Sequence, residues 1–139
     1  MDLDECYEKG LIKKTKINSS LIRSLIEMSK INETTVKESK INEVNISSYV
    51  VLAYESLREV MEAICISRGF KVISHICLGE LLKNLIEEFD FNEFDRIRYL
   101  RNGINYYGTK IEINQGKEII QKAFDTKNAL LRKYLKELI

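Results

Sequence analysis

The chain has 139 residues, a formal net charge of +1, no proline and no tryptophan, and 45% of its residues are hydrophobic. This length suits one domain with a substantial core, and the hydrophobic fraction is too high for a disordered chain. The near-neutral charge argues against a broadly basic nucleic-acid-binding surface, although it allows a local basic site. Because proline interrupts helices, its absence favours long helices joined by short connections.

Targeting segments and metal motifs are not evident. No stretch approaches the roughly 20 apolar residues of a membrane span, and the acidic start of the chain is unlike a secretory signal. Cys6, Cys65 and Cys77 lie far apart without a Cys-x-x-Cys pair, and the only histidine is His75, so the spacing of a zinc site is lacking. We therefore expect a cytoplasmic protein with reduced thiols and with no metal, cofactor or membrane partner.

The first half of the chain shows apolar residues at helical spacing. The pattern predicts helices over residues 2–9, 18–40 and 47–69. Asn18 or Ser19 can cap the second of these helices, Ser47 or Ser48 can cap the third, and Gly69 can end it. The helix over 47–69 has the widest apolar stripe and is expected at the centre of a bundle.

The second half continues the same pattern. It predicts helices over residues 74–89, 90–108 and 114–138, with an extended stretch over 110–113. Ser74 and Asp90 (or Asn92) can cap the first two, and Gly108 can end the second. Short connections between such helices make neighbours antiparallel. Residues 1–139 are thus predicted to form a single all-α domain, an up-and-down antiparallel bundle of four to five main helices with no significant sheet.

One segment of the helix over 90–108 combines arginine, asparagine and tyrosine. Its candidate binding residues are Arg98, Arg101, Asn102, Asn105 and Tyr106. Pairs four residues apart share a helix face, and no acidic residue lies from 97 to 110. Guanidinium and amide groups can hold a phosphodiester, and tyrosine rings can stack on bases. In the alternative interpretation, the arginines pair with acids on neighbouring helices and the tyrosines belong to the core.

The segment RNGINYYG, Arg101–Gly108, resembles the signature of HEPN domains (higher eukaryotes and prokaryotes nucleotide-binding). Ser48–Arg58 is similar to the second-helix segment of that family. Arg68–His75 is similar to a family loop that often reads Gly-aromatic-Lys-x-x-Ser-His. The resemblance implies a helical bundle that is commonly dimeric. Many members are metal-independent ribonucleases, often toxins encoded beside a minimal nucleotidyltransferase antitoxin.

The catalytic motif of the family is an arginine followed, four to six residues later, by a histidine. By resemblance Arg101 takes the arginine position, Asn102 takes the polar position beside it, and Tyr106 stands where the histidine would be. A tyrosine, with an ordinary pKa of about 10, is a poor base near neutral pH. His75 is expected in the first turn of the helix over 74–89, packed against the bundle, where the helix dipole disfavours its charged form.

These observations lead to an RNA- or nucleotide-binding HEPN-like module as the main hypothesis. The expected assembly is a homodimer, and a nucleotidyltransferase-type partner would fit a toxin–antitoxin pair. One alternative is a metal-independent endoribonuclease with Arg101 and Tyr106 as its catalytic residues. Another is a non-catalytic structural or interaction protein whose arginines form intersubunit ion pairs.

A row of carboxylates, Glu55, Glu59 and Glu62, follows helical spacing. Di-metal bundle sites combine such a row with Glu-x-x-His pairs, for which one histidine is too few. We expect these glutamates to form a solvated helix face.

Overall fold

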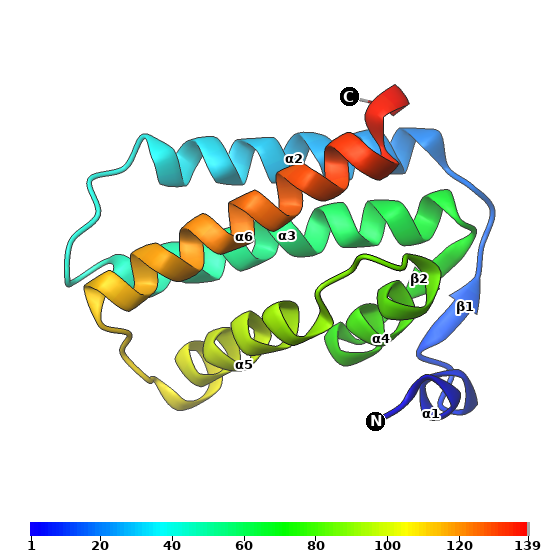
Figure 1. The fold of residues 1–139 in the computed structure, drawn as a ribbon, viewed down its shortest axis with the longest axis horizontal. Helices are drawn as coiled ribbons and strands as arrows, with labels where there is room; N and C mark the ends of the chain where they lie inside the picture. Colours follow the sequence, from blue (N-terminus) through cyan, green and yellow to red (C-terminus); the bar gives the residue numbers. More distant parts are fainter. Residues whose placement is uncertain (139) are drawn as a thin grey trace.

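A computed structural model describes residues 1–138, which form six α-helices, a two-stranded sheet and a short 3-10 helix (Figure 1). The elements in chain order are α1 (Leu3–Glu8), β1 (Ile12–Lys14), α2 (Ser19–Lys37), α3 (Ile46–Ser67), β2 (Phe70–Val72), α4 (His75–Leu85), α5 (Phe91–Tyr107), α6 (Ile113–Tyr134) and η1 (Lys136–Leu138). The predicted all-α helical bundle is confirmed.

Helix α3 is the centre of the bundle, as its wide apolar stripe predicted. It packs against α2 and α6 on one side and against α4 and α5 on the other (Figure 1). Residues at every turn of α3 are buried, from Ile46 to Ile66. Helices α4 and α5 are shorter than the other three long helices. The first turn of α4 lies against α3, where His75 contacts Tyr54.

The predicted helix ends are largely confirmed by the capping contacts. The side chains of Asn18, Ser74 and Asp90 each accept a hydrogen bond from a backbone N–H in the first turn of their helix. Gly69 follows α3 with φ +85°, and Gly108 caps α5 with φ +64°. This left-handed backbone region favours glycine, and both glycines occupy the positions predicted to end a helix.

Helix α4 is shorter than the sequence pattern predicted, because it ends at Leu85. Ile86 has extended backbone angles, yet Ile86 and Phe89 are both buried. The apolar spacing continues past the helix because the linking segment also packs on the core. Ser47, a predicted cap of α3, instead accepts a hydrogen bond from the backbone N–H of Ile111 at 3.2 Å.

The small sheet was not predicted. Strand β1 pairs antiparallel with β2, with Ile12 opposite Val72 and Lys14 opposite Phe70. Three-residue strands are too short to show an alternating pattern in the sequence. The stretch over 110–113, which was predicted to be extended, is not a strand. The pairing fastens the N-terminal segment to the loop that precedes α4.

The expectation of reduced thiols is wrong for two of the three cysteines. Cys6 in α1 and Cys77 in α4 are joined by a disulfide across a separation of 71 residues, with their Cα atoms 5.8 Å apart. Cys65 is free and buried, and burial raises the pKa of its thiol to about 12. The pairing depends on how α1 docks on α4, which the cysteine spacing does not reveal.

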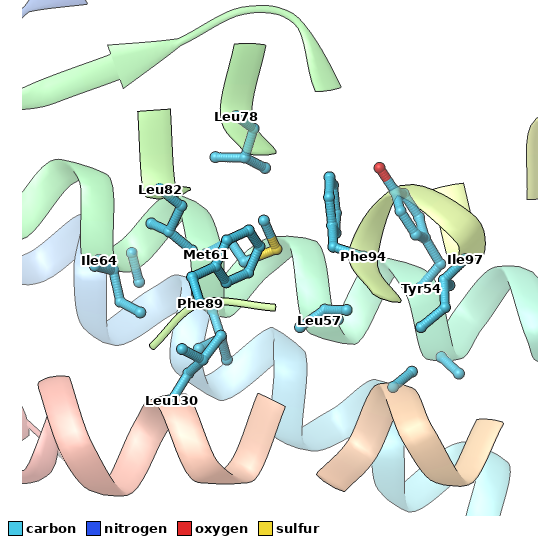
Figure 2. Packing of buried hydrophobic residues seen from close by; sticks show 14 of the residues in the cluster. Tyr54, Leu57, Met61, Ile64, Leu78, Leu82, Phe89, Phe94, Ile97 and Leu130 are labelled. Carbon is cyan, nitrogen blue, oxygen red and sulfur yellow. The ribbon is translucent and has the colours of Figure 1, made fainter. Parts of the chain in front are cut away.

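The hydrophobic core surrounds α3 (Figure 2). Leu57, Met61 and Ile64 of α3 belong to one buried cluster with Leu82 of α4, Ile97 of α5 and Leu130 of α6. Tyr54 lies at the edge of this cluster beside Phe94, and its hydroxyl points away from the aliphatic side chains. Within residues 1–138 no helix is long and apolar enough to cross a membrane.

The most deeply buried charged side chain of residues 1–138 is that of Lys127. Lys127 of α6 is 1% exposed, and its Nζ lies 2.5 Å from Oε1 of Glu33 and 3.2 Å from the carbonyl oxygen of Ser29. The Ser29 hydroxyl lies 3.0 Å from the Ser56 hydroxyl. These contacts connect α2, α3 and α6 through polar groups within an otherwise apolar interior.

Candidate functional site

Tyr54 lies where α3, α4 and α5 meet. Its side chain is buried, and its ring stacks on Phe94 with 5.9 Å between centroids. The Tyr54 hydroxyl lies 2.8 Å from Nδ1 of His75. Burial raises the pKa of Tyr54 above its ordinary value, although the positive charge of Arg101 opposes this shift. The phenol is therefore protonated near neutral pH, and its oxygen can accept from Nδ1–H or its hydroxyl can donate to an unprotonated Nδ1, depending on the His75 tautomer.

Arg101 of α5 lies over the same tyrosine. Its Cζ is 5.2 Å from the ring centroid of Tyr54 and 5.9 Å from that of Tyr106, which are cation–π distances. Nη1 donates to Oδ1 of Asn102 at 3.0 Å, and Nη2 donates to Oε1 of Glu55 at 3.4 Å. The guanidinium is thus held in a fixed orientation by groups from α3 and from its own helix.

One donor of Arg101 is unsatisfied. Among the buried side-chain nitrogen and oxygen atoms of residues 1–138, only Nε of Arg101 has no hydrogen-bond partner. Leaving a buried donor unpaired costs about 1–3 kcal/mol, and more for a charged group. A phosphate oxygen or a water molecule that reached Nε would remove this cost. Nε of Arg101 is therefore the atom of this site to which an additional hydrogen-bond acceptor can bind.

His75 is the first residue of α4, as expected, and is half-buried. Burial lowers its pKa below the ordinary value, and the positive charges of Arg101 and Arg58 lower it further. The imidazole is therefore neutral near pH 7, with one ring nitrogen able to accept a proton. His75 and Arg101 both contact Tyr54, so the only histidine lies beside the arginine of the predicted motif.

The other arginines of the site have carboxylate partners. Arg98 donates twice to Oδ1 of Asp95, one turn earlier on α5, at 3.0 and 2.8 Å. Arg58 of α3 lies 2.7 Å from Glu55 and 2.7 Å from Glu62. The acid-free stretch in the sequence therefore meets acidic side chains in three dimensions. An anion that binds at Arg101 must compete with Glu55.

The predicted strip is only partly assembled. Arg101, Asn102 and Tyr106 lie together, whereas the Arg98 guanidinium is directed to Asp95 and Asn105 is exposed. Tyr106 is 69% exposed, so it is a surface residue and not part of the core. The ion pair between Arg101 and Glu55 matches the alternative in which an arginine pairs with an acid on a neighbouring helix.

Tyr54 and Glu55 were not predicted as members of the site, and His75 was expected only to pack against the bundle. Tyr54 and Glu55 lie within Ser48–Arg58, and His75 ends Arg68–His75. Both segments carried the family resemblance, so the signal was present. No helical spacing connects them to Arg101, because they belong to different helices.

The glutamate row of α3 is not a solvated face. Glu59 is 7% exposed and accepts a hydrogen bond from Nδ2 of Asn32 at 2.8 Å, while Glu55 and Glu62 hold Arg58. Burial raises the pKa of Glu59 above its ordinary value, although the Asn32 hydrogen bond opposes this shift. Across residues 1–138, no three His, Cys, Asp or Glu side chains converge so that they could hold a metal ion.

Comparison with known proteins adds no assignment: no protein-family model, curated protein or solved structure matches the chain. The HEPN resemblance therefore stays a prediction from the sequence. The site must be interpreted from its own geometry.

Proposed function

We propose that the chain is an RNA- or nucleotide-binding module of HEPN-like type, and that Arg101 holds a phosphate group of the ligand. The observation that carries this proposal is the buried, unpartnered Nε of Arg101. A guanidinium can present Nε and one Nη together to two oxygens of a phosphate. Asn102 and Tyr106 flank the same guanidinium and can add polar and stacking contacts.

The competition with Glu55 does not prevent such binding. The contact from Glu55 to Arg101 is 3.4 Å, whereas that from Glu55 to Arg58 is 2.7 Å. Glu55 can therefore release Arg101 and keep its shorter ion pair with Arg58. Because Nε is buried, the Arg101 side chain must shift for a phosphate to reach it, and the phosphate would then gain two charge-assisted hydrogen bonds for the loss of one long contact.

A fluorescence-anisotropy titration with labelled single-stranded RNA tests this proposal. Arg101→Ala is expected to weaken binding about 10- to 150-fold, the equivalent of about 1.5–3 kcal/mol for charged hydrogen bonds. Arg101→Lys keeps the charge but loses the fork, and is expected to recover only part of the affinity. Arg23→Ala is the matched control, because Arg23 is an exposed arginine on α2. Equal affinities for Arg101→Ala and Arg23→Ala would contradict the proposal.

A second candidate function, metal-independent RNA cleavage, is favoured by His75. In this reaction the RNA 2′-oxygen attacks the adjacent phosphorus, a 2′,3′-cyclic phosphate forms, and the bond to the 5′-oxygen breaks. In the tautomer in which Nδ1–H of His75 donates to the Tyr54 oxygen, Nε2 is unprotonated and would accept the 2′-hydroxyl proton. Arg101 would stabilise the negative charge on the phosphoryl oxygens, and water would protonate the departing oxygen. A neutral imidazole suits this role better than Tyr106, the residue that the motif position suggested.

Cleavage of labelled RNA in EDTA tests this second candidate. The expected products carry a 2′,3′-cyclic phosphate and a 5′-hydroxyl, and both His75→Gln and Arg101→Ala are expected to abolish their formation. A preparation that binds RNA but yields no such products would leave binding as the function and exclude catalysis by His75.

The predicted homodimer and nucleotidyltransferase-type partner belong to the same proposal. Sedimentation of the purified chain tests the dimer. If the chain is instead a structural or interaction protein, Arg101→Ala should weaken self-association and no variant should bind RNA.

A further inference from the structure

A pocket opens beside Arg101 at the C-terminal end of α5. It has a volume of about 410 Å³, within the range of small-ligand sites. We call it the tyrosine pocket, and the residues that line it include Tyr99, Asn102, Gly103, Tyr106, Tyr107 and Thr109. Asn102 and Tyr106 also touch Arg101, so the pocket continues the proposed phosphate site.

The local fold explains why the pocket is open. Gly108 turns the chain back with a positive φ, and the backbone N–H of Thr109 donates to the carbonyl of Gly103 at 3.0 Å. A Cβ on Gly103 would lie 3.4 Å from Oγ1 of Thr109, at the edge of ordinary van der Waals contact, so the returning chain packs closely on this turn of α5.

Aromatic rings are unusually accessible around this pocket. Tyr99, Tyr106 and Tyr107 are 73%, 69% and 84% exposed. Tyr99 and Tyr106 are seven residues apart and lie on one helix face, with Asn102 between them. Exposed rings that surround a concave site offer flat surfaces on which other rings can stack.

We propose that the tyrosine pocket binds unpaired nucleobases, and that the ligand of the Arg101 site is therefore single-stranded RNA. This inference rests on the proposed function, because Arg101 holds the phosphate between the stacked bases. Stacking on tyrosine requires a base that is not paired in a duplex. The Nδ2 of Asn102 can donate to a base edge while its Oδ1 accepts from Arg101.

The lining of the tyrosine pocket fits a nucleobase better than it fits a second copy of the chain. The polar groups of Asn102 and Thr109 line the pocket, and the cation of Arg101 lies next to it. A combination of aromatic faces, an amide and a neighbouring cation matches a base attached to a phosphate. Self-association through the tyrosines is an outcome of the test below.

The test measures binding of three probes: single-stranded oligoadenylate, an abasic RNA backbone of the same length, and duplex RNA. Tyr99→Ala is expected to weaken oligoadenylate binding about 5- to 150-fold, the measured range of base–aromatic stacking, and to leave abasic RNA unchanged. Tyr99→Phe keeps the ring and should bind as the unaltered protein does. Tyr7→Ala is the matched control, because Tyr7 is an exposed tyrosine on α1, at the other end of the molecule (Figure 1).

The remaining outcomes separate this inference from the proposed function. If Tyr99→Ala binds oligoadenylate normally while Arg101→Ala does not, the pocket inference fails and the phosphate site stands. If Tyr99→Ala weakens intact and abasic RNA equally and dissociates the protein in sedimentation, the pocket serves self-association and the inference fails. If no probe binds the unaltered protein, the inference and the proposed function both fail.

Discussion

The hydroxyl of Tyr54 lies 2.8 Å from Nδ1 of His75, although the two residues are 21 positions apart and belong to different helices. Tyr54 is buried, so its hydroxyl needs a partner, and His75 supplies one at the surface of the bundle. Since Arg101 lies over the same tyrosine ring, this hydrogen bond connects the only histidine to the proposed phosphate site.

The first prediction concerns the pH dependence of stability. Burial and the positive charge of Arg101 lower the pKa of His75 in the folded protein, whereas the unfolded chain binds its proton near the ordinary value of 6.5. Below pH 6.5 the unfolded state therefore binds more protons, and the free energy of unfolding falls as the pH drops. His75→Gln removes this contribution and should have the flatter profile between pH 7 and pH 5. Parallel urea-unfolding profiles for the two proteins would show that the histidine is not perturbed.

Glu55 is expected to restrain RNA binding. Glu55→Gln removes the carboxylate that competes for Nη2 of Arg101, so affinity for single-stranded RNA should rise about fivefold, the equivalent of about 1 kcal/mol. Glu62→Gln is the control, because Glu62 pairs with Arg58 in the same way and removes the same charge. If the affinity for RNA rises equally in both variants, the effect comes from net charge and not from competition at Arg101.

The buried Lys127 contributes to stability. Lys127→Ala breaks its ion pair with Glu33 and leaves a cavity, and the expected loss is about 3 kcal/mol of unfolding free energy. The loss stays near the lower end for a broken buried pair, because Glu33 keeps its contact with Lys37. Lys127→Met fills most of the space and should lose less. Urea unfolding measures both, and wild-type stability of Lys127→Ala would contradict the buried pair.

The disulfide between Cys6 and Cys77 predicts a response to reductant. Reduction should lower the free energy of unfolding by about 2–5 kcal/mol, because the bond closes a long loop in the unfolded chain. Alkylation of unreduced, denatured protein should modify Cys65 alone. Modification of all three cysteines would mean that the bond is absent. The variant with Cys6→Ser and Cys77→Ser should be insensitive to reductant.

The helices of the bundle were predictable because helix position and helix ends depend mainly on residues close together in the sequence. Apolar spacing along α3 and the caps at Asn18 and Ser74 follow from neighbouring residues, and these features are confirmed. The end of α4 was misjudged because Ile86 and Phe89 are buried without being helical. Local patterns report burial, and they cannot distinguish a buried helix from a buried linker.

The candidate site was predictable only on α5. Arg101, Asn102 and Tyr106 lie within six residues of one helix, so their closeness follows from the sequence, whereas the four-residue pairs that include Arg98 and Asn105 do not assemble at the site. The contacts of Arg101 with Glu55 and Tyr54, and of Tyr54 with His75, join three helices and depend on how these helices pack. The sequence allowed an ion pair between an arginine of this segment and an acid on a neighbouring helix, but it could not identify Glu55 as the partner.

The most direct measurement is the Nε–Hε resonance of Arg101 in a proton–nitrogen correlation NMR spectrum. This donor is buried and unpartnered in the free protein. Addition of single-stranded RNA should shift the resonance strongly and saturably as a phosphate oxygen accepts its hydrogen bond, while the Nε–Hε resonance of Arg23 stays in place. An Arg101 resonance that does not move at saturating RNA, or that moves no more than that of Arg23, would contradict phosphate binding at this site.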